Sequence, residues 1–115
     1  MCGIYAVIHD DSAVEKTLAG IKRLDYRGYD SWGIASIDTG KIQHYKQSGV
    51  IGETYLDLRG DTAIGHTRWA THGKVSQVNS HPHLSPTGKF ALVHNGIVEN
   101  EQELRDELLQ KNYTF

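Results

Sequence analysis

MCGIYAVI, residues 1–8, is the stretch of sequence from which the fold and the chemistry of this chain are predicted. Its β-branched and aromatic residues predict a strand that starts beside Cys2. Cys2 is the only cysteine in the chain, and it becomes the N-terminal residue if an aminopeptidase removes Met1, as happens when a small residue follows. A thiol and a free α-amine would then lie on one residue that the strand holds in place.

A residue of this kind carries both a nucleophile and a base. An unperturbed thiol has a pKa of about 8.5 and an α-amine one of about 7.7–8.0, so part of the amine is neutral at pH 7 and can accept the thiol proton. This is the terminal-amine form of the nucleophile–base pair found in hydrolases. The alternative is that the lone cysteine is a small buried hydrophobic residue, but its position at residue 2 favours the nucleophile.

The composition is that of an ordinary globular domain, with 115 residues, 38% hydrophobic and 23% charged. The net charge of −2 is spread along the chain, so no nucleic-acid partner is expected. No apolar run approaches the roughly 20 residues of a membrane span, and the N-terminus does not resemble a signal peptide. A single unpaired cysteine suits a reducing compartment, so we expect a cytoplasmic protein. We expect no contact with a membrane and no cofactor.

Hydrophobic periodicity predicts an α+β chain. Ser12 and Glu15 read as a capping box at the start of a helix that ends before Gly28. Strands are predicted at residues 33–38 and 42–47, joined by a turn at 39–41, and again at residues 63–68 and 90–94. Asn100 and Glu103 mark the start of a second helix, and residues 112–115 look like the entrance to a further strand.

Two segments that follow predicted strands carry more polar side chains than packing requires. In residues 65–73, an arginine (Arg68), a threonine and a histidine could together bind a carboxylate. In residues 93–100, Asn95-Gly96 could direct a side-chain amide and a backbone N–H toward one point, as in an oxyanion hole. The alternatives are a solvated surface charge for Arg68 and a hairpin turn for Asn95-Gly96.

Histidines offer a rival hypothesis, because imidazole is the commonest metal ligand in proteins. Five of them lie within one stretch of the chain: His66, His72, His81, His83 and His94. Their spacing matches no helical or knuckle-type zinc motif, and no second cysteine is present to complete one. No metal site is therefore expected.

Taken together, these segments resemble the class II glutamine amidotransferases, which use an N-terminal cysteine nucleophile and belong to the Ntn-hydrolase fold group. The resemblance covers essentially the whole chain, and its motifs are specific in combination and order. They are CGI (2–4), LDYRGYDS (24–31), HTRWATHG (66–73), NSHPH (79–83) and HNGIVEN (94–100). Segments 26–31 and 68–73 match the branch that aminates fructose 6-phosphate better than the amidophosphoribosyltransferases.

The resemblance implies a fold and a reaction. The fold is a four-layer α/β/β/α sandwich of antiparallel sheets, of which this chain would form the N-terminal portion. Cys2 would attack the side-chain amide of L-glutamine and release ammonia, with Asn95 and Gly96 as the oxyanion hole. The residues expected to bind or surround glutamine are Arg68, Trp69, Thr71, His72 and, in a supporting role, Arg27.

The resemblance also implies what the chain lacks. Residues 1–115 would be a type 2 glutamine amidotransferase domain that is incomplete at its C-terminal end. The sugar isomerase domains, which use fructose 6-phosphate in the parent protein, would be absent. The full-length parent is expected to be a homo-oligomer. Trp32 stands where many relatives have a small residue, and it is expected to repack the surroundings of the site without touching its chemistry. Two alternatives stay open: an inactive fragment that needs the missing residues or a partner, and the glutaminase part of another class II enzyme such as an amidophosphoribosyltransferase.

Overall fold

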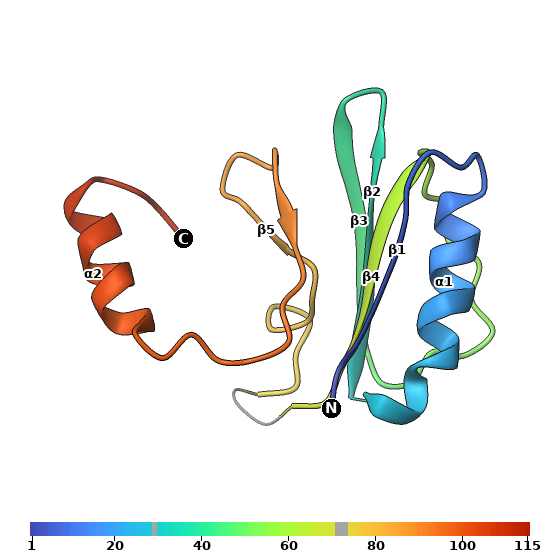
Figure 1. Cartoon of the computed structure of the whole chain (residues 1–115), viewed down its shortest axis with the longest axis horizontal. Helices are drawn as coiled ribbons and strands as arrows, with labels where there is room; N and C mark the ends of the chain where they lie inside the picture. Colours follow the sequence, from blue (N-terminus) through green and yellow to red (C-terminus); the bar gives the residue numbers. More distant parts are fainter. Residues whose placement is uncertain (29, 71–73) are drawn as a thin grey trace.

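The computed structural model describes residues 1–28, 30–70 and 74–115. Its main feature is a four-stranded antiparallel sheet with the strand order β1-β4-β2-β3. The strands are β1 (Gly3–Val7), β2 (Ser31–Asp38), β3 (Lys41–Ser48) and β4 (Thr62–Arg68). Helix α1 (Ala13–Arg23) lies along one face of this sheet (Figure 1), and the short 3-10 helix η1 (Asp25–Arg27) follows it.

On the other side of the sheet lies a second, smaller sheet. It consists of β5 (His83–Leu84) and β6 (Ala91–Leu92), which pair antiparallel, and helix α2 (Glu101–Gln110) follows them. Figure 1 shows α2 on the far side of β5 from the main sheet. The order helix, sheet, sheet, helix agrees with the predicted α+β sandwich. No helix in the described part of the chain is both long and apolar enough to cross a membrane.

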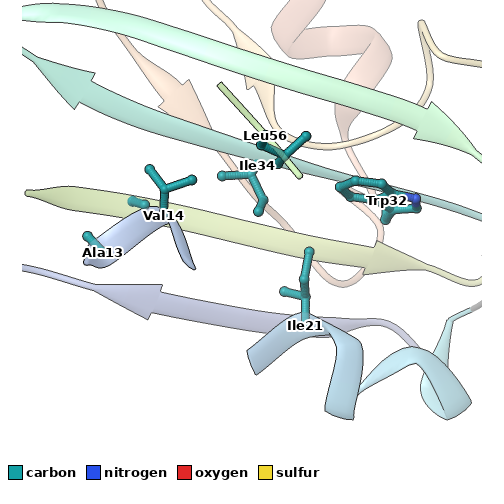
Figure 2. Close-up of a cluster of buried hydrophobic side chains, with 7 residues drawn as sticks. Ala13, Val14, Ile21, Trp32, Ile34 and Leu56 are labelled. Carbon is teal, nitrogen blue, oxygen red and sulfur yellow. The ribbon is translucent and has the colours of Figure 1, made fainter. Parts of the chain in front are cut away.

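The hydrophobic core lies between α1 and the main sheet (Figure 2). Ala13, Val14 and Ile21 of α1 pack with Trp32 and Ile34 of β2. Burying each large apolar side chain of this kind stabilises the fold by roughly 1.5–3 kcal/mol. Helix and sheet approach closely at Gly65 of β4, where a Cβ atom would come within 2.8 Å of methyl groups of both Thr17 and Ile21.

The hairpin β2–β3 forms where it was predicted, around Thr39 and Gly40. Both residues have positive φ angles, 49° and 76°, which is the backbone of a two-residue type I′ turn. Lys41, expected in the turn, is the first residue of β3.

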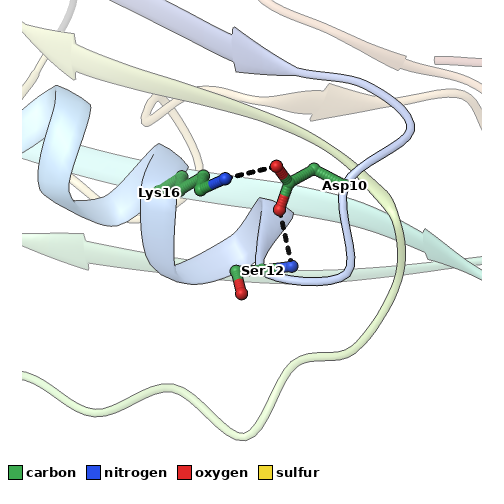
Figure 3. A network of polar contacts seen from close by, with 3 residues as sticks. All are labelled: Asp10, Ser12 and Lys16. Atoms are coloured by element: carbon green, nitrogen blue, oxygen red, sulfur yellow. Dashed lines mark hydrogen bonds and ion pairs between the residues drawn. The ribbon is translucent and has the colours of Figure 1, made fainter.

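Three local predictions are wrong. Ser12 makes no side-chain cap at the start of α1; instead Asp10 accepts a hydrogen bond from the Ser12 N–H at 2.8 Å and pairs with Lys16 (Figure 3). The strand expected at residues 90–94 is only β6, and residues 112–115 form no strand. Strands exist only where a neighbouring strand pairs with them, which periodicity alone does not reveal.

Candidate active site

The position of Cys2 is fixed because β1 begins at the next residue, Gly3. Gly3 pairs with Thr67 of β4, and its N–H donates to the Thr67 hydroxyl at 3.2 Å. The half-buried Cys2 Sγ accepts a hydrogen bond from the Trp69 N–H at 3.3 Å and lies 3.8 Å from the Trp69 carbonyl oxygen. The thiol is therefore held by backbone at the point where β4 ends.

A cleft of about 300 Å³ opens beside Cys2. It is lined by Cys2, Arg68, Trp69, His81, His94, Gly96 and Ile97. Among these described residues, the Arg68 guanidinium is the one permanent charge, and no carboxylate lines the cleft. A pocket with a nucleophile and a cation suits a substrate that carries an anionic group.

Arg68 is not a solvated surface charge, so that alternative is wrong. It is the last residue of β4, its side chain is 8% exposed, and Nη1 donates to the Lys74 carbonyl at 3.2 Å. Asp30 holds the chain on either side of it, since the Asp30 N–H donates to the Arg68 carbonyl at 3.2 Å and the Asp30 carboxylate accepts from the Ala70 N–H. A buried guanidinium with anchored neighbours is suited to hold a carboxylate in one orientation.

Asn95-Gly96 is not a hairpin turn either, because no strand follows it in the described residues 74–115. The Asn95 amide instead contacts two residues far away in the sequence. Its Nδ2 donates to the Cys2 carbonyl at 3.1 Å, and its Oδ1 lies 2.7 Å from Nε2 of His66. Gly96 has a φ of 141°, which residues with a Cβ rarely adopt.

Three histidines at or near the cleft, His66, His81 and His83, have pKa values below that of a free imidazole. Burial lowers the pKa of His66, and the hydrogen bonds to Asn95 and to the His94 backbone only partly offset this. Burial, with the neighbouring imidazoles, lowers the pKa of His81 to about 3; burial also lowers that of His83. Within residues 1–28, 30–70 and 74–115, no group of three or more His, Cys, Asp or Glu side chains is placed to hold a metal ion.

The other predicted site residues fall into two groups. Trp69 lines the cleft and is 43% exposed, while Arg27 ends η1 with Nη2 2.7 Å from the sulfur of Met1, next to the N-terminus. Thr71 and His72 lie outside the described residues. The structure thus brings Cys2 and Arg68 together with Trp69, Asn95 and Gly96, and it places Arg27 beside the residue that precedes Cys2.

Trp32 points away from the cleft. It is 1% exposed in the core beneath α1, with its ring 5.5 Å from that of Tyr45. Its bulk is therefore accommodated on the helix side of the sheet. Sequence reasoning missed the contact of His66 with Asn95, because it depends on how β4 meets the segment after β6 and no spacing along the chain indicates it.

Solved structures identify the fold. One similar structure, described as the allosteric regulatory enzyme of purine biosynthesis, matches the whole chain with a TM-score of 0.83 and 28% identity. Another, the glutamine phosphoribosylpyrophosphate amidotransferase from B. subtilis, matches it with a TM-score of 0.80 and 27% identity. The chain covers 26% of each of these two proteins. The chain has the Ntn-hydrolase fold of these two proteins and is similar to the class II glutamine amidotransferases.

Sequence comparison narrows the class. Curated relatives similar to the whole chain are glutamine–fructose-6-phosphate aminotransferases (isomerizing), with 50% identity for Pyrococcus horikoshii, 48% for Leifsonia xyli and 47% for Aquifex aeolicus. The chain spans about a fifth of the length of these relatives, 20% in each case. No family model matches the chain.

Proposed function

We propose that this chain carries the glutamine-hydrolysing site of a glutamine–fructose-6-phosphate aminotransferase. The observation that supports this most is that the Cys2 and Arg68 side chains line one cleft while the Asn95 amide contacts the Cys2 backbone at its edge. The similarity to curated relatives over the full length of the chain adds to it. The substrate is L-glutamine, and residues 1–115 form part of a type 2 amidotransferase domain.

The reaction begins once Met1 has been removed. The free α-amine of Cys2 takes the thiol proton while Sγ attacks the side-chain carbonyl carbon of glutamine, which gives a tetrahedral intermediate with a negative oxygen. Asn95 Nδ2 and the Gly96 N–H donate hydrogen bonds to that oxygen. The C–N bond then breaks, the departing nitrogen takes the proton from the amine, and ammonia and a glutamyl thioester result. Water cleaves the thioester to give glutamate and regenerate the thiol.

Substrate orientation comes from the arginine at the end of β4. The Arg68 guanidinium binds the α-carboxylate of glutamine, assisted by Thr71 and His72, while Trp69 covers the substrate. Arg27 lies next to the N-terminus and has a supporting role there. Because no carboxylate lines the described part of the cleft, nothing among those residues repels the anionic end of the substrate.

The acceptor of the ammonia lies outside this chain. In the whole protein, sugar isomerase domains convert fructose 6-phosphate and ammonia to glucosamine 6-phosphate, and we propose that this occurs in a cytoplasmic homo-oligomer. The curated relatives favour this acceptor over a phosphoribosyl group, because the amidotransferases of the purine pathway are the more distant matches, at 27–28% identity.

An intact-mass experiment tests the proposal. The purified chain is weighed before and after incubation with 6-diazo-5-oxo-L-norleucine, an electrophilic glutamine analogue. We expect loss of Met1 and a single adduct on Cys2 that excess L-glutamine prevents. The matched control is Cys2→Ala, which should form no adduct and hydrolyse no glutamine. An adduct that glutamine does not prevent, or glutamine hydrolysis by Cys2→Ala, would contradict the proposal.

A further inference from the structure

The segment that carries the proposed oxyanion donors has no regular structure of its own. It lies between β6, which ends at Leu92, and α2, which begins at Glu101, and both Asn95 and Gly96 are exposed. Side-chain hydrogen bonds connect it to parts of the chain far away in sequence. They include those from the His94 N–H to His81 Nδ1 at 3.3 Å, from Asn95 Nδ2 to the Cys2 carbonyl, and between Asn95 Oδ1 and His66 Nε2. The position of the donors therefore depends on these contacts.

Hydrogen-bond chemistry fixes the direction of the last two bonds. The Cys2 carbonyl can only accept, so the nitrogen of the Asn95 amide must face it and donate. The Asn95 oxygen then faces His66, and because an amide oxygen can only accept, His66 Nε2 must carry a proton. If the amide turned over, its oxygen would face the Cys2 carbonyl and would repel the negative oxygen of the intermediate. His66 excludes that orientation.

His66 is itself rigidly placed. It lies in the middle of β4 opposite Ile4 of β1 and Gly33 of β2, and it is fully buried. Its ring stacks on that of His81, with centroids 4.2 Å apart and planes inclined by 21°. The close approach of His81 is possible because residue 33 is glycine: a Cβ there would lie 2.2 Å from the His81 carbonyl oxygen.

We propose that His66 is a positioning residue for the oxyanion hole: its Nε2–H holds the Asn95 amide with the nitrogen toward the nucleophile. The inference rests on the proposed glutamine hydrolysis. A neutral imidazole with its proton on Nε2 performs this role, and the lowered pKa of His66 agrees with that state. His66 is not among the residues that line the cleft, and its Nε2 contacts Asn95 at 2.7 Å, so it acts through Asn95.

Two substitutions separate the hydrogen bond from the volume of the ring. His66→Gln places an amide N–H near the position of Nε2, whereas His66→Met fills similar space without a donor. For His66→Met we expect glutamine kcat to fall about 10–100-fold, less than the roughly 10²–10³-fold cost of deleting an oxyanion donor. KM should stay within about threefold, since a group that acts in the transition state affects mainly kcat. His66→Gln should recover most of the loss.

Several kinetic results would overturn the inference. They are an unchanged kcat in His66→Met, a His66→Gln variant as slow as His66→Met, or a loss that appears in KM alone. Absence of glutamine hydrolysis in the unsubstituted chain is a different result, because it would contradict the proposed function and leave the state of His66 to be judged by spectroscopy.

Nuclear magnetic resonance supplies that second measurement, and it requires neither activity nor a stable variant. Long-range ¹H–¹⁵N correlations of the unsubstituted chain should show His66 protonated on Nε2 and not on Nδ1 at neutral pH. A proton on Nδ1 and not on Nε2 would refute the positioning role.

Discussion

The N-terminal region, residues 3–68, and the C-terminal region, residues 83–115, are built in different ways. The first has a paired four-stranded sheet with α1 packed on it and a core of buried side chains. In the second, two short strands pair through two residues each, and no residue is buried. Apolar side chains of α2, such as Leu104 and Leu109, are exposed. The first region therefore has its own core, whereas the second has none.

The proposed site draws on both regions. Cys2 and Arg68 adjoin strands of the N-terminal region, so the nucleophile and the guanidinium have a rigid support. Asn95 and Gly96 come from the C-terminal region, and polar contacts to the first region position them. If the proposed function holds, the two parts of the site are joined by hydrogen bonds and stacked rings, and weakening this junction should affect activity more than it affects the core.

The largest effect should come from closing the space at this junction. In Gly33→Ala the added Cβ would lie 2.2 Å from the His81 carbonyl oxygen and 2.9 Å from that of Tyr45. Because both atoms belong to the backbone, the segment that carries His81 must move away from the sheet. We expect the free energy of unfolding, measured in urea, to fall by about 1–3 kcal/mol. Glutamine hydrolysis should fall as well, because His81 and His66 separate.

Gly52→Ala is the matched control for this substitution. No atom lies within 4 Å of the position of its added Cβ, so stability and rate should both stay close to those of the unsubstituted chain. If Gly33→Ala behaved like Gly52→Ala, the segment that carries His81 would not lie in close contact with the main sheet.

A second effect is expected from acid. The pKa values of His66, His81 and His83 are all lowered from 6.5, that of His81 to about 3. Between the lowered pKa values and 6.5, the unfolded chain binds protons that the folded chain does not. The free energy of unfolding therefore falls as the pH falls below 6.5, and above pH 6.5 these groups do not affect it. One fully titrating group contributes a slope of at most about 1.4 kcal/mol per pH unit. Because His81 is only half-buried, solvent screens its charge, and its contribution to the slope is smaller than this maximum.

The contribution of His81 can be isolated with His81→Asn, which cannot take up a proton in this range. Urea unfolding of both proteins at a series of pH values from 7 to 4.5 should show a shallower acid loss in the variant. Carboxylates do not confuse the comparison, because they titrate mainly below about pH 4.5 and are common to both proteins. Equal slopes would mean that His81 is not kept neutral by the fold.

Local signals in the sequence predicted much of the N-terminal region. The hairpin at Thr39-Gly40 and helix α1 were found because turn chemistry and helical periodicity involve residues close together in the chain. The strands expected at residues 90–94 and 112–115 were overestimated, since a strand needs a partner whose position the local sequence does not encode.

The same division holds for the site. Resemblance to a family singled out Cys2, Arg68 and Asn95 by their motifs, and the structure brings all three to one cleft or its edge. The contact of His66 with Asn95 follows from neither motif nor spacing. It arises from tertiary packing, which brings His66 of β4 next to the segment after β6.

The smallest predicted effect concerns the start of α1, within the well-packed region. Ser12 has the residue type and position of a helix cap, yet its side chain makes no cap hydrogen bond. Ser12→Ala should therefore change the free energy of unfolding by less than about 0.5 kcal/mol, as an ordinary surface substitution does. Asp10→Ala should lower the melting temperature more, because the Asp10 carboxylate accepts from the Ser12 N–H and pairs with Lys16. Thermal unfolding of both variants, followed by circular dichroism, decides the order. If Ser12→Ala lowered the melting temperature more than Asp10→Ala does, the result would support the capping box predicted from the sequence.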